Sequence, residues 1–202
     1  MSKILGDNDI IVIDNLLDDF NIESIRENIL STEIPWFYNS TEGNTTVGSP
    51  IDTLDPKILE FHKTQVEEGP QLCYLVYRDG KLLGSSQLNN IRTITIPLQK
   101  KFDVVVDMTR VKYNLQFQIT NGSKDKHNTP HVDSKFPHMT MIYYVNDSDG
   151  DTFFFDKKLN VTKRVSPKAG RAVIFKGDIM HTGQHPINSH ARCVINMNFE
   201  VV

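Results

Sequence analysis

The last hundred residues consist of short apolar runs separated by turn residues, and this pattern constrains the fold more than any other feature. Runs rich in Val, Ile, Phe, Tyr and Thr predict strands near residues 111–119, 129–134, 139–145, 151–155, 159–165, 171–175, 179–184 and 191–201. Turns are predicted at 147–150, where the residues indicate a tight hairpin, and at 166–170 and 176–178. Many short strands are typical of a jelly roll or barrel.

The first half of the chain mixes helical and strand patterns. Strands are predicted over residues 9–17 and 71–77, and helices over 18–31, 52–66 and 88–102, the last one weakened by Pro97. We therefore expect a mainly β protein with N-terminal α/β support. At 202 residues the chain fits one domain, with supporting elements in 1–105 and the β core in 106–202.

Composition and charge narrow the class of protein. The formal net charge is −3 with acids and bases mixed along the chain, so nucleic acid is not implied as a partner. Cys73 and Cys193 are too few for a disulfide framework and suit a reducing cytoplasm. No stretch approaches the ~20 apolar residues of a membrane span, and the N-terminus lacks the apolar run of a signal peptide. We expect a cytoplasmic protein without a membrane partner.

A short motif, His131-Val132-Asp133, is the first candidate for chemistry. Residues two apart on a strand project to the same face, so His131 and Asp133 can grip one metal ion from the predicted strand 129–134. A facial non-haem Fe(II) site needs two histidines and one carboxylate. His181 and His185 are both open as the second histidine. The motif alone is weak evidence, but it follows a polar loop and precedes an apolar strand, which favours a site at a barrel mouth.

Arg192 is the second candidate. It begins the last predicted strand, where alternation places it on one face with Val194, Asn196 and Asn198. A cation and two amides aimed at a barrel interior need polar or anionic partners. One interpretation is a bidentate contact between the guanidinium and a dicarboxylate cosubstrate, and the other is an arginine that turns outward to water.

These residues belong to a longer ordered set of motifs. The set comprises His131-Val-Asp133, residues 141–146, 149–153 and 165–175, His181-Thr-Gly183 with Pro186, and Arg192. In this order it resembles the 2-oxoglutarate- and Fe(II)-dependent dioxygenases, and within them the prolyl 4-hydroxylase-like branch, bacteriophage versions included. The resemblance covers roughly residues 110–200 and implies a double-stranded β-helix, a cupin-like jelly roll.

The resemblance implies a role for each matching residue. His131, Asp133 and His181 would be the iron ligands. Arg192 would bind the distal carboxylate of 2-oxoglutarate, helped by the hydroxyl of Tyr144.

Two departures from the pattern of the family concern the same site. The interval between His181 and Arg192 is longer than in many relatives, which keeps His185 as an alternative ligand. The upstream strand lacks the usual tyrosine at its end, so Asn114, Gln116 or Gln118 would line the inner wall of the cosubstrate pocket. Asn196, on the face of Arg192, is expected to contact the cosubstrate as well.

The activity implied is that of a dioxygenase that uses Fe(II), 2-oxoglutarate and O2. It would hydroxylate an unidentified primary substrate and release succinate and CO2. Related halogenases have a small residue at the carboxylate ligand, so Asp133 favours hydroxylation. Peptidyl proline as the substrate is implied by the resemblance to the prolyl 4-hydroxylase-like branch alone. A free amino acid, another protein side chain, another small molecule or a nucleic acid base are further possible substrates. If the chain is encoded by a phage, its location would be the cytoplasm of the host.

The alternative is a non-catalytic double-stranded β-helix protein that binds a metal or a partner. A binding protein has no physical need to keep all three ligands together with Arg192, so the complete set favours the enzyme.

Two further segments bear on the substrate. A basic cluster over residues 157–168 could meet an acidic peptide or a phosphate, although a solvated hairpin is the simpler reading. The polar loop 121–130 is a candidate lid over the site, by its position alone.

Overall fold

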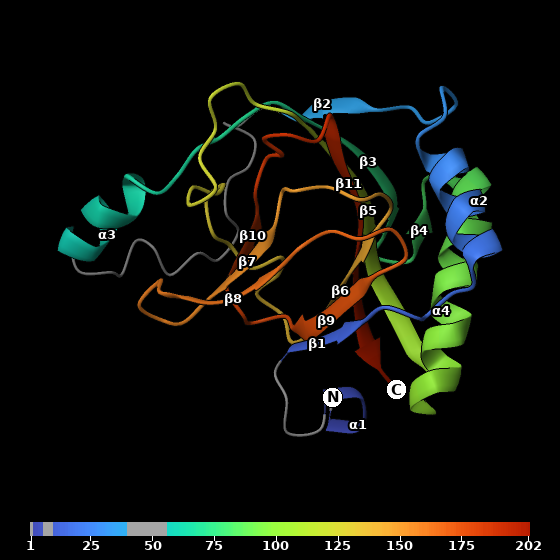
Figure 1. Cartoon of the computed structure of the whole chain (residues 1–202). Helices are drawn as coiled ribbons and strands as arrows, with labels where there is room; N and C mark the ends of the chain where they lie inside the picture. The colour runs from blue at the N-terminus through green and yellow to red at the C-terminus, as the bar shows by residue number, and fades with distance from the viewer. Residues whose placement is uncertain (1, 6–9, 40–55) are drawn as a thin grey trace.

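The computed structural model describes residues 2–5, 10–39 and 56–202 (Figure 1). The first elements are α1 (Ser2–Leu5), β1 (Ile10–Ile13), α2 (Asp19–Ile29), β2 (Phe37–Asn39) and α3 (Pro56–Lys63). They are followed by β3 (Gln71–Arg78), β4 (Lys81–Leu82), the 3-10 helix η3 (Ser85–Gln87) and α4 (Leu88–Phe102). The remaining strands are β5 (Val106–Phe117), β6 (Met139–Tyr144), β7 (Thr152–Phe155), β8 (Val161–Val165), β9 (Ala172–Lys176), β10 (His181–Gly183) and β11 (Ala191–Val201).

The strands form two antiparallel sheets. The larger sheet has the order β1-β9-β6-β11-β5-β3-β2, with β4 beside β3, and the smaller has the order β10-β7-β8. From β6 onward the chain passes repeatedly between them, because β6, β9 and β11 belong to the larger sheet and β7, β8 and β10 to the smaller. This arrangement is the double-stranded β-helix, so the predicted fold class is confirmed.

Alternation along the strands divides the side chains between two sides of the larger sheet. On β5, Val111 and Tyr113 are buried in a core that includes Ile94 and Leu98 of α4. Helices α2 and α4 lie along this side of the sheet (Figure 1). Each fully buried aliphatic side chain stabilises the fold by about 1.5 to 3 kcal/mol. The opposite side of β5 carries Lys112, which lines a cavity.

Most of the predicted local elements are present. The carboxylate of Asp18 caps α2 by accepting a hydrogen bond from the backbone N–H of Asn21 at 2.8 Å. Helix α4 forms with Pro97 inside it. Between β3 and β4, Asp79 and Gly80 both have positive φ, as a two-residue hairpin turn requires. The first residues of the predicted helix 52–66, and most of the loop before it, lie outside the described residues.

Two predictions for the β core are wrong. Residues 129–134 do not form a strand; His131 makes a single isolated bridge with His181. Pro130 has no N–H for a ladder, and the side chain of Asp133 is held by neighbouring strands instead. Residues 147–150 do not form a hairpin either, because β6 and β7 belong to different sheets.

The connection 147–150 is tied to the connection between β10 and β11. The carboxylate of Asp149 accepts hydrogen bonds from the backbone N–H groups of Ile187, Asn188 and Ser189 at 2.8 to 3.2 Å. Burial alone would raise the pKa of Asp149, but the hydrogen bonds from Ser189 and Asn188 outweigh it and lower this pKa to about 2. The ionised carboxylate therefore holds two connections together.

Two further predictions concern the chain as a whole. The single domain over 1–202 and its boundary at residue 105 stay a prediction, although β1 and β3 join the larger sheet. Among the described residues no helix is long and apolar enough to cross a membrane.

Replacing Asp149 with alanine should lower the free energy of unfolding by about 1 to 3 kcal/mol at pH 7, because the backbone donors lose a charged acceptor. A lowered pKa in the folded state stabilises the fold above the pKa of the unfolded carboxyl and loses this effect as the pH falls toward 2. Urea unfolding should show the difference between wild type and variant shrinking from pH 4 to pH 2. A difference that does not change with pH would contradict the role of the charge.

Candidate metal and cosubstrate site

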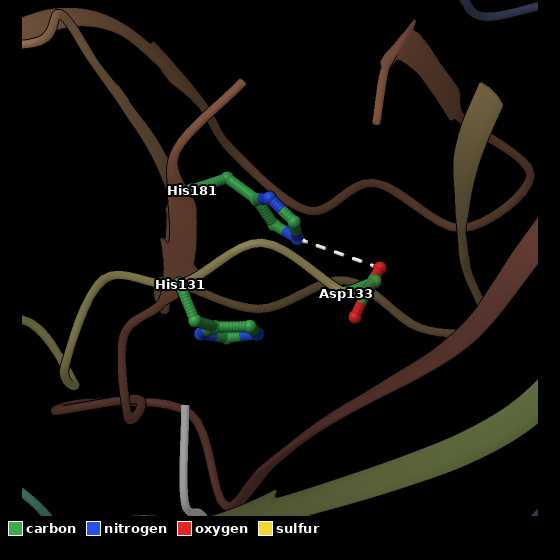
Figure 2. A group of neighbouring side chains, drawn as sticks. All are labelled: His131, Asp133 and His181. Carbon is green, nitrogen blue, oxygen red and sulfur yellow. Dashed lines mark ion pairs between the residues drawn. The ribbon is translucent and has the colours of Figure 1, made fainter. Parts of the chain in front are cut away.

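Three of the predicted site residues converge at one point. The ligand atoms of His131, Asp133 and His181 all lie within 4.8 Å of one another. Figure 2 shows the three side chains directed toward a common point, with His181 Nε2 3.7 Å from Asp133 Oδ2. His131 and Asp133 come from the connection after β5, and His181 begins β10. Two backbone hydrogen bonds of 3.0 Å join His131 and His181 and fix the spacing of the rings.

The backbone also fixes the tautomers of both histidines. Nδ1 of His131 lies 3.1 Å from the carbonyl of Thr129, and Nδ1 of His181 lies 3.0 Å from that of Ile179. A carbonyl only accepts, so each Nδ1 carries the proton and each Nε2 keeps a free lone pair. Metal-binding histidines usually donate their other ring N–H to an acceptor in this way.

Asp133 is held in place by three side chains from the larger sheet. Arg110 on β5 donates to its Oδ1 at 3.0 Å, and Asn196 and Asn198 on β11 each donate to its Oδ2 at 3.0 Å. Burial alone would raise the pKa of Asp133, but the Arg110 cation and the hydrogen bond from Asn198 hold it well below its usual value. The carboxylate is therefore charged, as a metal ligand must be.

His181 is suited to the same task. Burial lowers its pKa to about 4, and this effect outweighs the nearby carboxylate of Asp133, which would raise it. The imidazole is therefore neutral near pH 7. Two histidine nitrogens and one carboxylate form a donor set that fits Fe(II).

Arg192 lies buried on the wall of the same cavity. Its Nε donates to the carbonyl of Gly150 at 2.8 Å, Nη1 to Gln116 at 2.7 Å and Nη2 to Thr152 at 2.8 Å. A Cβ at Gly150 would meet the Arg192 side chain, and one at Gly183 would lie 2.9 Å from Nη1. Two glycines thus give the guanidinium its space.

Tyr144 is placed differently from the prediction. Its hydroxyl donates to the Thr152 hydroxyl at 2.7 Å, and its ring centroid lies 5.9 Å from the guanidinium carbon of Arg192. The cavity lining does not include it. Tyr144 therefore supports Thr152 and Arg192 from behind.

The cavity has a volume of about 360 Å³, within the range of small-molecule sites. It is lined by the three clustered residues, by Arg192, and by Glu68, Gln71, Arg78, Arg110, Lys112, Asn114, Gln116, Asn128, Thr129, Val132, Ile142, Thr182, Gly183, Val194 and Asn196. The predicted Asn114 and Asn196 are thus on the wall. Gln118 is not, and it bonds to the Ile187 carbonyl instead.

The structure separates His185 from the site. Its Nδ1 bonds to the carbonyl of Phe117, and it is not part of the cluster that holds His181. The loop 121–130 is not a free lid, because Gln184 bonds to the carbonyls of Ser123 and Lys126 and Arg164 bonds to that of Lys124.

Sequence reasoning missed Arg110. A signal was available, because alternation on β5 places Arg110 on the same face as Asn114 and Gln116, two residues that the sequence predicts on the cavity wall. The prediction began this strand at residue 111, so Arg110 fell outside it.

The comparisons with known proteins agree with this geometry. Residues 115–200 match the family model described as the 2OG-Fe(II) oxygenase superfamily. This segment contains all three clustered residues and Arg192. No curated protein sequence matches the chain.

Similar solved structures include an oxidoreductase of the 2OG-Fe(II) oxygenase family from Burkholderia pseudomallei, with a TM-score of 0.63 at 11% identity over 95% of this chain and 85% of that one. A prolyl hydroxylase from Trichoplax adhaerens has a TM-score of 0.59 at 13% identity, over 96% and 84%. The viral collagen prolyl hydroxylase from Paramecium bursaria Chlorella virus-1 has 0.53 at 12% identity, over 98% and 99%. At these identities the likeness shows the fold alone.

The matched segment, residues 115–200, is similar to the 2OG-Fe(II) oxygenases, a class of enzymes. The family resemblance seen in the sequence is thereby confirmed. Fe(II), 2-oxoglutarate and O2, the predicted cofactors, are those that this family uses.

Asn198 should set the metal affinity through Asp133. Replacing it with alanine removes one donor to Asp133 and the amide oxygen that accepts from Arg110 at 2.9 Å, so the carboxylate loses its orientation. We expect Mn(II) affinity to fall about 10- to 100-fold, as measured by calorimetric titration. Asn90→Ala on α4 is the matched control. A folded Asn198→Ala variant with wild-type affinity would refute this role.

Proposed function

We propose that the chain is an Fe(II)- and 2-oxoglutarate-dependent hydroxylase in which His131, Asp133 and His181 hold the iron and Arg192 holds the distal carboxylate of 2-oxoglutarate. The observation that carries the proposal is the convergence of two imidazole nitrogens and one carboxylate on a cavity that a buried guanidinium also lines. When bound, iron and 2-oxoglutarate would together supply the oxidising power to insert one oxygen atom of O2 into a C–H bond, with succinate and CO2 as co-products.

The protein's part in this chemistry is to hold three ligand atoms in their protonation states. The carbonyls of Thr129 and Ile179 keep both Nε2 atoms available for the metal. Arg110 and the two asparagines of β11 keep Asp133 ionised and in one orientation. A carboxylate at this position supports hydroxylation over halogenation.

The residues around Arg192 fit a carboxylate. A guanidinium has five N–H groups, and the hydrogen bonds in the described part of the chain use three of them. Two N–H groups are thus left for a bidentate contact. The hydroxyl of Thr152 accepts from both Arg192 and Tyr144 and so holds the guanidinium in place from behind the cavity wall. Asn114 and Asn196 are proposed as further polar contacts.

Peptidyl proline is the first substrate to test. The support is that two of the similar structures are prolyl hydroxylases, one of them in complex with a peptide from hypoxia inducible factor. Proline-containing peptides and free amino acids should be incubated with the chain, Fe(II) and 2-oxoglutarate, and the products screened by mass spectrometry for one added oxygen.

The metal ligands are tested by removing one of them. His131→Ala should abolish succinate formation from 2-oxoglutarate and O2, because two ligands no longer define a facial site. Exposed His190 provides the matched control, and His190→Ala should keep the wild-type rate. A wild-type chain that binds neither Fe(II) nor 2-oxoglutarate would favour the non-catalytic binding protein instead.

The cosubstrate contact is tested at Arg192. Arg192→Met should raise the KM for 2-oxoglutarate by about tenfold or more, since a charged hydrogen-bonded contact contributes about 1.5 to 3 kcal/mol. Mn(II) affinity should stay unchanged, because Arg192 does not contact the cluster. Arg192→Lys keeps the buried charge and controls for misfolding, and Arg92→Met on α4 controls for loss of a surface cation. An unchanged KM in folded Arg192→Met would overturn the assignment.

A further inference from the structure

The cavity has a positive charge that the proposed iron and cosubstrate do not remove. Its lining contains four cationic side chains and two carboxylates, namely Arg78, Arg110, Lys112 and Arg192 against Glu68 and Asp133. Among these six side chains two positive charges are in excess. Fe(II) and the 2-oxoglutarate dianion carry opposite and equal charges, so their binding leaves this excess unchanged. The whole chain has a formal charge of −3, so the cavity is a positively charged region of a chain that is negative overall.

Two of the four cations are already committed. Arg110 is paired with Asp133, and Arg192 is bonded to the wall and assigned to 2-oxoglutarate. The other two are Lys112 and Arg78. Lys112 has no hydrogen bond or ion pair in the described part of the chain, and the residue paired with it on β3 is Leu75. Arg78 has one ion pair, 3.5 Å to Asp79, with both side chains more than half exposed, and such a pair is weak.

The positions of these cations bring them to one wall. Lys112 and Arg110 are two residues apart on β5, so both side chains face the cavity. Arg78 lies opposite Arg110 in the ladder between β3 and β5. Burial, together with the neighbouring Arg110 charge, lowers the pKa of Lys112, and this effect outweighs the nearby Asp133 carboxylate, which would raise it.

An unpartnered acceptor lies beside Lys112. Asn196 is opposite Lys112 in the pairing of β5 with β11, the residue is 6% exposed, and it lines the cavity. Its Nδ2 donates to Asp133, but its buried Oδ1 has no hydrogen-bond partner. A buried acceptor without a donor costs about 1 to 3 kcal/mol. A ligand that donates to this oxygen would remove that cost at a residue that itself bonds to Asp133, a proposed iron ligand.

We infer that the primary substrate presents an anionic group, a carboxylate or a phosphate, to Lys112 and Arg78, and donates a hydrogen bond to Oδ1 of Asn196. This inference rests on the proposed function, since it assigns Arg192 to 2-oxoglutarate and the remaining cations to the substrate. It makes the wall formed by β3 and β5 the part of the cavity that selects substrates by charge.

The test measures binding, with the redox-inactive Mn(II) in place of Fe(II). The full chain, loaded with Mn(II) and 2-oxoglutarate, is titrated calorimetrically with N-acetylated forms of the standard amino acids, each as the free carboxylate and as the amide. Glycerol 3-phosphate and glycerol form the matched pair for a phosphate. We expect the tightest ligand to be anionic and to lose about 10- to 100-fold in affinity when its charge is removed.

Lys112→Met should cause a loss of the same size for the anionic ligand, and Lys112→Arg should restore most of the affinity. Lys100→Met on α4 is the matched control for loss of a surface lysine. Thermal unfolding of each variant checks that the fold is kept. The affinity for 2-oxoglutarate should be the same in wild type and Lys112→Met.

Three results would overturn the inference: a neutral tightest ligand, no anionic ligand at all while 2-oxoglutarate binds, or Lys112→Met that weakens 2-oxoglutarate as much as it weakens the anions. Failure of the proposed function is distinguishable, because wild type would then not bind 2-oxoglutarate. In that case titrations with Mn(II) alone still report whether anions depend on Lys112.

Discussion

The buried carboxylate of Asp133 is the interaction on which the rest of the site depends. An ionised group that is 3% exposed is tolerable only if charges and donors surround it, and here Arg110, Asn196 and Asn198 supply them. These partners come from the two strands β5 and β11, whereas Asp133 belongs to a connection with no ladder of its own. The carboxylate therefore fixes the connection to the sheet. His131, two residues earlier, is fixed with it and reaches His181 through the isolated bridge.

The same strands build the core and the site, which explains how the site keeps its geometry. On β11, Cys193, Ile195 and Met197 are fully buried in the core on the helix side, while Arg192 and Asn196 alternate with them toward the cavity. A slip of one residue would exchange the two sets, placing amides and a guanidinium in the core. Core packing therefore fixes the register, and the register places the polar groups. The irregularity between β11 and β5 at Asn198 lies at the point where Arg110 turns toward Asp133, as is common for β-bulges near functional sites.

The sequence predicts those features that depend on local pattern. Seven of the eight predicted strands of the C-terminal half form, and alternation places Arg192 with Asn196 correctly. The strand predicted over residues 129–134 does not form. The hydrogen bonds that hold Asp133 come from strands distant in the sequence, and a local pattern does not show them. His181 and His185 cannot be separated by spacing, since only the tertiary bridge to His131 decides between them. Tyr144 is predicted to contact the cosubstrate through its hydroxyl, but this hydroxyl donates to Thr152 instead. Only the tertiary structure brings Thr152 of β7 beside Tyr144 of β6.

Net charge is a poor guide to this cavity because it averages over surfaces that never meet the ligand. The excess positive charge arises from Arg110 and Lys112 on β5 and from Arg78 on the neighbouring strand β3, in a chain that is acidic overall. A sheet wall with several cations is costly unless anions compensate them, and in the described part of the chain Asp133 forms an ion pair with Arg110 but none with Lys112. Folding energetics alone would favour a neutral residue at 112, since Lys112 is half-buried next to another cation and close to no carboxylate that bonds it. Its presence is therefore best explained by a negatively charged ligand that the folded chain itself does not supply.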